Sequence, residues 1–130
     1  GEQQPEVDHA MERQNSSTGN NRNEFWREAR NEGYFSYKLA TGKESGLSLM
    51  VRYWGAEKGN RSFDIYIDDQ KLITENISDK WKQNKFQNVE YPIPDAILNG
   101  KEFVRVKFKA LAGNTAGKVY YVRLLRTNKK

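Results

Sequence analysis

Apolar and polar residues alternate along seven short segments of this chain, and Gly, Asn or Asp residues separate most segments from the next. Every second residue of 47–54 is apolar, and 62–68 repeats the pattern with Phe63, Ile65 and Ile67. A period of two with one apolar face is typical of a strand that lies half-buried in a sheet. The segments expected to form strands are 34–40, 47–54, 62–68, 71–77, 86–93, 103–111 and 118–126.

Short strands at this spacing predict an all-β domain, an antiparallel β-sandwich of jelly-roll topology. The sandwich is expected over residues 25–126, after a polar N-terminal arm, 1–24, and before a basic tail, 127–130. Within the arm, an edge strand is expected at Ala10–Gln14, and the rest is expected to be loop. A turn at Phe25–Ala29 is expected to place an aromatic ring at one end of the sandwich. A hairpin tip is expected at Asp69–Gln70, and a single turn over 95–101.

The composition of the chain excludes several kinds of functional site. The 130 residues suffice for one domain with a sizeable core. The chain has no cysteine, which excludes thiolate metal sites, and its one histidine, His9, is expected to be a spectator in the polar arm. No apolar run approaches the roughly 18 residues that a membrane span needs, and the polar, acidic residues 1–8 predict no signal peptide within them.

The charged residues predict neither a nucleic-acid partner nor a catalytic site. The net charge of +5 is a modest bias, and the alternating row of Arg105, Lys107 and Lys109 is expected to be a solvated strand face. Asp68 and Asp69 suit a turn. Asp64 and Glu75 are expected to face each other across the 62–77 hairpin, with no cleft between them. No glycine-rich phosphate loop is present, so we expect no enzyme activity.

Three tryptophans are the remaining clue to function. Trp26 precedes the first strand, Trp54 ends the second, and Trp81 lies in a loop. An exposed indole beside Asn or Arg suits the apolar face and the hydroxyls of a sugar. Alternatively, each Trp caps an end of the sandwich.

A structural calcium ion has one candidate ligand, Glu12. An N-terminal Glu and an Asp near the last strand supply oxygen ligands in several sandwich modules. Here Gln14 is uncharged, and the last strand carries Arg123 and Arg126. We therefore expect no cofactor, and Glu12 stands as the calcium candidate.

Several longer motifs stand out along the chain, namely His9–Glu12, Asn15–Gly19, Trp26–Arg27, Gly33–Tyr37, Val51–Gly55, Gly59–Asp69, Val89–Pro94, Arg105–Phe108 and Ala112–Gly117. Together they resemble the C-terminal galactose-binding-like β-sandwich of bacterial glycoside hydrolases of family 127, the β-L-arabinofuranosidase type. The likeness covers residues 9–126 and implies a bacterial, Bacteroides-like source, a catalytic domain elsewhere in the parent chain, and a periplasmic or extracellular location. The family's zinc-linked Cys and Glu residues have no match here, so its activity does not carry over.

The resemblance extends to a broader superfamily that includes carbohydrate-binding modules of families 6 and 35. Their sugar sites use loop aromatics and an Asn near the last turn, for which Trp81 and Asn114 are the nearest counterparts, and their paired N-terminal Glu residues are half matched by Glu12. Two functions stay open. One is a structural or interaction domain that packs on a glycoside hydrolase or self-associates. The other is a non-catalytic accessory module that binds plant-derived glycan through Trp26, Trp54, Trp81 and Asn114.

Overall fold

The computed structural model describes residues 12–126 and confirms the predicted all-β antiparallel fold. All the predicted strands are present, and the bounds of only the first differ from the prediction by more than three residues. This is because 34–40 is the second part of a longer strand. The elements are β1 Glu12–Asn21, β2 Glu24–Ala40, β3 Leu47–Trp54, β4 Ser62–Ile67, β5 Gln70–Asn76, β6 Phe86–Pro92, α2 Asp95–Leu98, β7 Phe103–Ala110 and β8 Thr115–Arg126.

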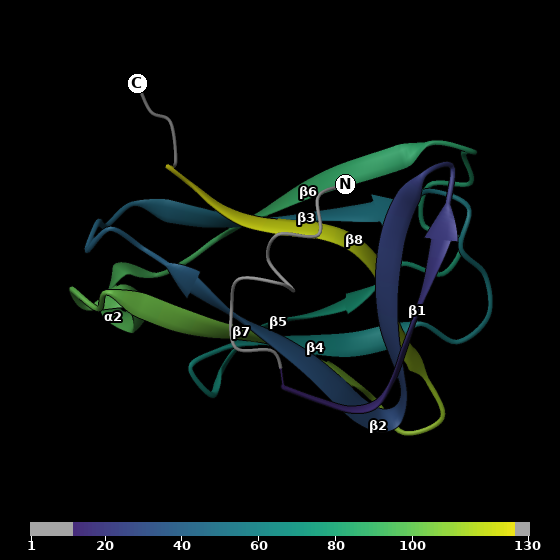
Figure 1. The fold of residues 1–130 in the computed structure, drawn as a ribbon, viewed down its shortest axis with the longest axis horizontal. Helices are drawn as coiled ribbons and strands as arrows, with labels where there is room; N and C mark the ends of the chain where they lie inside the picture. The colour runs from purple at the N-terminus through teal and green to yellow at the C-terminus, as the bar shows by residue number, and fades with distance from the viewer. Residues whose placement is uncertain (1–11, 127–130) are drawn as a thin grey trace.

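The strands form two layers that share the long, bent strand β2 (Figure 1). The strand order is β5-β4-β7-β2-β8-β3-β6, with β1 paired to β2. β2 pairs with β8 through Arg27–Arg30 and with β7 through Tyr34–Ala40. Between these stretches Asn31 and Glu32 adopt positive φ angles of 47° and 65°, and the strand turns there from the β8-β3-β6 layer into the β5-β4-β7 layer.

The N-terminal hairpin differs from the prediction. β1 and β2 pair from Glu12 to Asn21, so the loop expected beyond Gln14 is strand, and the turn expected at Phe25–Ala29 is wrong because those residues lie in β2. Arg22 and Asn23 close the hairpin with φ angles of 52° and 67°. A two-residue loop with two left-handed residues matches the twist of paired strands. The Asn- and Ser-rich run of β1 has low strand propensity, and pairing with β2 outweighs that preference.

The core lies between the two layers and follows the predicted alternation. Two stacked rings from different strands, Phe35 and Phe108, have centroids 5.1 Å apart, and Phe63 lies 6.3 Å from Phe108. The turn after β6 is confirmed as α2, and the β4–β5 tip lies at Asp68–Asp69, one residue earlier than expected. The apolar residues that alternate along these strands are buried, namely Phe35, Tyr37, Leu39, Leu47, Leu49, Val51, Tyr53, Phe63, Ile65, Ile67, Val104, Val106, Phe108 and Ala110.

A buried polar network joins β5 and β6, the strands at the two ends of the strand order. The Tyr91 hydroxyl donates to Glu75 Oε2 at 2.7 Å and lies 2.7 Å from the Tyr53 hydroxyl. Lys80 Nζ donates to Glu75 Oε1 at 2.8 Å. A buried carboxylate is costly unless it is paired and hydrogen-bonded, and these partners satisfy that condition. Burial raises the pKa of both tyrosine hydroxyls above the usual range.

The predicted facing of Asp64 and Glu75 is wrong. The register places Asp64 opposite Thr74 and Phe63 opposite Glu75. Since successive strand residues point to opposite faces, Glu75 enters the core while Asp64 accepts a hydrogen bond from Thr74 on the outer face.

Candidate functional site

Three aromatic rings meet on the face of β3 that points away from the core. Trp54 and Phe86 are cross-strand partners of β3 and β6. Their ring centroids lie 5.0 Å apart in an edge-to-face arrangement, and Phe86 contacts Tyr120 of β8 in the same way at 4.9 Å. Trp54 and Phe86 are half-buried, whereas Tyr120 is buried. We call Trp54, Phe86 and Tyr120 the aromatic platform.

A hydrogen-bonded arginine borders the platform. Arg52 lies two residues before Trp54 on the same face, and its Cζ is 4.4 Å from the Phe86 ring centroid. Its Nε and Nη2 donate to the two carboxylate oxygens of Glu24 at 2.9 and 3.0 Å, and Nη1 donates to Asn88 Oδ1 at 3.0 Å. This bidentate pairing fixes the guanidinium plane. The hydrogen bond from Arg52 also holds the pKa of Glu24 below its usual value.

The tip of the β1–β2 hairpin lies against the same rings. Arg22 places its Cζ 4.9 Å from the Trp54 ring centroid, and Asn21 Nδ2 donates to the Tyr120 hydroxyl at 3.1 Å. Burial raises the pKa of Tyr120 to about 12. The platform is therefore bordered by cationic and amide groups from a segment far from β3 in sequence.

A polar depression of about 540 Å³ opens beyond the ends of β3 and β6, between loops 55–61 and 78–85. Backbone hydrogen bonds hold the two loops together, with Gly55 N donating to Lys85 O at 2.8 Å and Gln83 N to Gly55 O at 3.2 Å. A Cβ at Gly55 would lie 2.6 Å from Gln83 O, so this close approach requires glycine. The depression is lined by Ala56, Lys58, Asp79, Lys82 and Asn84.

The structure separates the other two predicted tryptophans from Trp54. Trp81 stacks on Tyr53 at 6.0 Å and packs against the core, so it lies on the opposite face of β3 from Trp54. Trp26 lies within β2 instead of before the first strand, and its indole covers Gly19 of β1, where a Cβ would lie 2.2 Å from Trp26 Cζ2. Lys118 Nζ lies 4.7 Å from the Trp26 ring centroid.

Asn114 organises the loop before β8. Its Oδ1 accepts a hydrogen bond from Ser62 N at 3.0 Å, and its Nδ2 donates to Ala112 O at 2.9 Å. Its backbone oxygen also accepts from Asn31 N at 2.8 Å. These bonds tie the loop to β4 and to the bend in β2, which is a structural role. A contact of Asn114 with sugar stays a prediction.

The described residues show no arrangement suited to metal binding. Within residues 12–126, no group of three or more His, Cys, Asp or Glu side chains is placed to hold a metal ion. His9 and the side chain of Glu12 lie outside what is described, so the calcium prediction is untested. No helix in this part of the chain has the length and apolarity needed to cross a membrane.

Sequence reasoning singled out Trp54 as a candidate but not the residues that surround it. Phe86 begins a predicted strand, and pairing that strand with 47–54 in antiparallel register would have placed it beside Trp54. No pattern in the sequence placed Arg22 and Asn21 beside Trp54, because the hairpin that carries them was expected to be a loop.

This curled antiparallel sheet is the β-sandwich fold of carbohydrate-binding modules. A family 35 carbohydrate-binding module from Clostridium thermocellum is similar over 88% of this chain and 91% of its own, with a TM-score of 0.66 and 13% sequence identity. A second family 35 module, from Cellvibrio japonicus Abf62, is similar over 93% and 90%, with a TM-score of 0.65 and 12% identity. Identities this low establish the fold alone.

The family assignment rests on the sequence. The model of a family of unknown function, DUF6805, matches residues 1–125, so this chain belongs to that family. No curated protein sequence matches the chain significantly. The structure of an exo-β-1,3-galactanase from Phanerochaete chrysosporium, in complex with β-1,3-galactotriose, contains a similar region. That region covers 92% of this chain but 28% of the galactanase chain, with a TM-score of 0.64 and 7% identity.

Proposed function

We propose that this domain is a non-catalytic module that binds carbohydrate on the aromatic platform and in the adjoining polar depression. The observation that carries the proposal is the pair of half-buried, outward-facing rings, Trp54 and Phe86, on the outer face of β3 and β6. A sugar presents an apolar face that stacks on such rings and a rim of hydroxyls that needs polar partners.

The polar groups around the rings fit that rim. Glu24 and Asn88 hold the Arg52 side chain in place, so Arg52 loses little conformational entropy when a ligand binds. The depression adds the ammonium groups of Lys58 and Lys82. Arg52, Lys58 and Lys82 supply hydrogen-bond donors for sugar hydroxyls, and Asp79 and Asn84 of the depression supply acceptors.

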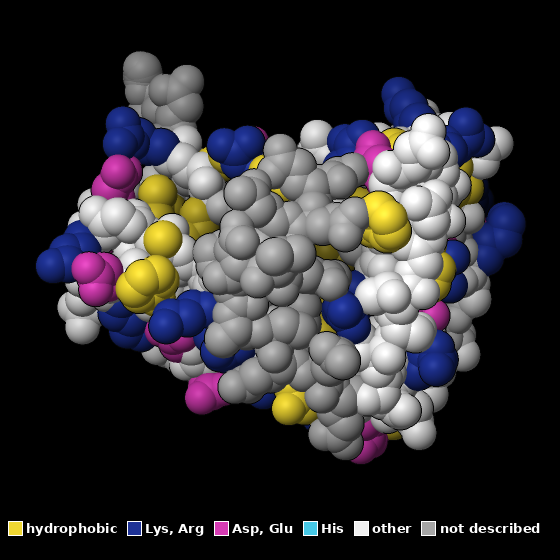
Figure 2. Space-filling view, in the orientation of Figure 1, with side chains coloured by type: hydrophobic (Ala, Val, Ile, Leu, Met, Phe, Trp, Pro, Cys, Tyr) yellow, Lys and Arg dark blue, Asp and Glu magenta, His cyan; other side chains and the backbone are white. Residues whose placement is uncertain are grey.

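The part of the surface that is visible in Figure 2 is less suited to a broad protein contact. On the face drawn in Figure 2, outside the grey atoms, hydrophobic side chains form small separate spots among Lys and Arg. Protein-docking surfaces usually expose a larger contiguous apolar patch.

The fold supports the same proposal. The two family 35 modules that resemble this chain are described as carbohydrate-binding, and the galactanase contains a similar region within an enzyme chain. We propose that the parent protein is likewise a glycoside hydrolase, of the family 127 type suggested by the sequence motifs. A secreted protein from a Bacteroides-like bacterium, acting in the periplasm or outside the cell, fits this proposal. A catalytic domain in the full-length coding sequence would support the parentage.

Affinity gel electrophoresis in arabinan, galactan and xylan tests the sugar-binding role. We expect at least one polysaccharide to retard the protein and Trp54→Ala to abolish the retardation. Ile73→Ala is the matched control, because Ile73 is an exposed hydrophobic residue on β5, in the other layer. Migration unaffected by all three polysaccharides, or retardation that survives Trp54→Ala, would refute the proposal.

The alternative is a structural domain that packs on a catalytic domain or on itself. The observation in its favour is Phe25, which lies next to Glu24 at the hairpin tip and is 46% exposed. If no polysaccharide retards the protein, sedimentation of the domain alone and with the remainder of the parent chain tests this role. A complex that Phe25→Ala weakens would support packing.

A further inference from the structure

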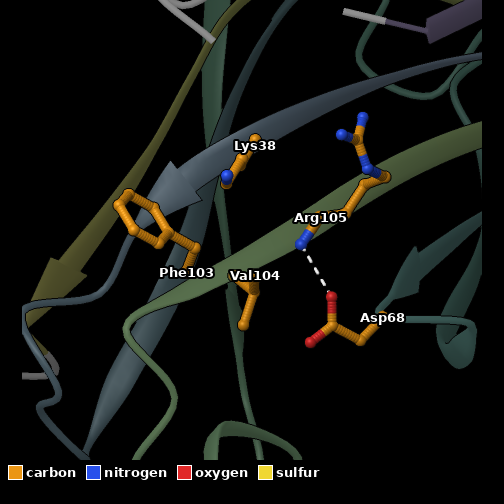
Figure 3. A pocket seen from close by; sticks show the side chains of 5 residues that line it. All are labelled: Lys38, Asp68, Phe103, Val104 and Arg105. Carbon is orange, nitrogen blue, oxygen red and sulfur yellow. Dashed lines mark hydrogen bonds between the residues drawn. The ribbon is translucent and has the colours of Figure 1, made fainter. Parts of the chain in front are cut away.

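A small pocket in the β5-β4-β7 layer combines an exposed aromatic ring with fixed polar groups (Figure 3). It lies where β2 ends and β7 begins, beside the β4–β5 turn, and has a volume of about 230 Å³. Phe103 is 43% exposed there, although most Phe side chains are buried in folded proteins. Lys38, Asp68 and Arg105 also line the pocket, and Val104 points into the core. We call this the Phe103 pocket.

Asp68 is held in a single orientation. Its Oδ2 accepts a hydrogen bond from Lys101 Nζ at 2.9 Å, and its Oδ1 accepts from the Arg105 backbone N at 2.8 Å (Figure 3). Its own backbone N donates to Arg105 O at 2.9 Å. A carboxylate offers about four acceptor directions, so Asp68 can still accept hydrogen bonds from hydroxyl groups of a ligand. A group already fixed in place loses little entropy on binding.

Lys38 is the movable partner in the pocket. It is the cross-strand neighbour of Arg105, and two cations directly opposite each other repel. Its Nζ lies 4.6 Å from the Phe103 ring centroid, and Figure 3 shows the ammonium turned toward that ring. An exposed cation–π contact is worth about 0.5–1 kcal/mol. A hydroxyl that accepts from the ammonium can therefore replace this contact, which uncovers the ring.

We propose that the Phe103 pocket is a second carbohydrate contact that holds one sugar residue. The apolar face of the sugar stacks on Phe103, one hydroxyl donates to Asp68, and another accepts from Lys38. The pocket is smaller than the roughly 300 Å³ at which drug-sized sites begin, which suits a single ring. The ligand class rests on the proposed function, but the residues come from β2, β7 and the β4–β5 turn and share none with the platform.

A second contact changes how a polymer binds. Once one sugar of a chain occupies the platform, the Phe103 pocket meets the rest of that chain at an effective concentration set by its length and stiffness. Two weak contacts can then hold a polysaccharide that neither would hold alone, provided that the chain spans both.

Backbone-amide NMR titrations with L-arabinose, D-galactose and D-xylose, each added separately, test the pocket. We expect at least one sugar to cause saturable shifts of millimolar affinity at Lys38, Asp68, Phe103 and Arg105. The shifts should persist in Trp54→Ala, because that variant leaves the pocket intact. If none of the three sugars causes saturable shifts at these amides, the proposal is wrong.

Two substitutions of Phe103 distinguish stacking on an aromatic ring from contact with any apolar side chain of similar size. Phe103→Leu keeps an apolar side chain but removes the ring, and it should weaken sugar binding by about three- to tenfold, as expected for one aromatic contact. Phe103→Tyr keeps the ring and should bind as the wild type does. Equal affinities for the two variants would overturn the stacking role.

The outcomes also separate this proposal from the first one. If sugars cause saturable shifts at the Phe103 pocket but Trp54→Ala does not change retardation in the gels, the proposal for the pocket is supported and the proposal for the platform is refuted. If retardation depends on Trp54 but no sugar causes shifts at the pocket, the proposal for the platform is supported and the proposal for the pocket is refuted.

Discussion

Tyr53 and Trp54 are neighbours at the end of β3, yet they belong to different surfaces. Tyr53 points inward, where it is fully buried between Phe63, Trp81 and the hydroxyl of Tyr91. Trp54 points outward and is half-buried against Phe86 and Arg22. The side-chain period of two thus separates an aromatic residue that stabilises the fold from one that is free to meet a ligand.

The largest expected difference between the two faces is in stability. Tyr53→Ala should lower the free energy of unfolding by about 3–5 kcal/mol, as for other large core residues cut to Ala. Trp54→Ala should cost about 1 kcal/mol, the worth of one partly exposed aromatic contact. Urea denaturation of both variants measures these values. Similar losses for the two would mean that Trp54 is a core residue and would remove the contrast.

The inner network should show the next largest effect. Tyr91→Phe removes the hydroxyl that donates to Glu75, and hydrogen bonds to charged groups contribute about 1.5–3 kcal/mol. We expect a loss of about 2 kcal/mol by chemical denaturation. Tyr66→Phe is the control, because the half-buried Tyr66 hydroxyl donates to Asp64 at 3.4 Å, a long hydrogen bond. If the two variants lose equal stability, the network has no special role.

The Glu24–Arg52 pair should make the outer face sensitive to acid. Arg52 lowers the pKa of Glu24 in the folded protein. The stabilisation is therefore present above the ordinary carboxyl pKa and is lost as the pH falls through the lowered folded value. We expect Glu24→Gln to cost about 0.5–1 kcal/mol at neutral pH and less in acid. A cost that stays constant across a series of thermal melts at different pH would contradict this.

Glu57 should show the smallest effect, with the opposite sign. Burial raises its pKa despite the nearby Arg61 guanidinium. Its contribution is complete below the ordinary carboxyl pKa and is lost as the pH rises through the raised folded value. Glu57→Gln should therefore gain stability relative to the wild type between acidic and neutral pH, by up to about 0.5 kcal/mol. Relative stability that falls over that range would show that the Arg61 pair outweighs burial.

The sequence predicted the parts of this molecule whose side chains alternate. Residues 47–54 and 103–110 each have an apolar residue at every second position, and their strands and the burial of those residues are confirmed. The run Asn15–Asn21 has no apolar alternation, so its pairing with β2 was not predictable from local pattern. For the same reason the hairpin tip that borders the platform was missed.

The candidate site was predicted only in part, because strand pairing is a long-range property. Trp54 was expected to meet a ligand, and its outward face and half-exposure fit that role. Trp81 was expected in a loop, and the loop is present, but its indole packs on Tyr53. Phe103 shares the strand face of the predicted solvated row that begins at Arg105. The pocket beside it was not predictable, because it depends on Asp68, 35 positions earlier in the chain, being held by Lys101 and the Arg105 backbone.

The position of β8 bears on how this domain forms during synthesis. β8 lies between β2 and β3, so the last described strand to leave the ribosome is also an inner strand of its layer. Until it arrives, the β3–β6 pair is separate from the sheet formed by β1, β2, β7, β4 and β5, and the edges of β2 and β3 that β8 covers are open. Open strand edges readily pair with other chains. A nascent chain halted before Thr115 should therefore be prone to aggregation, and the domain should complete its fold only once β8 is available.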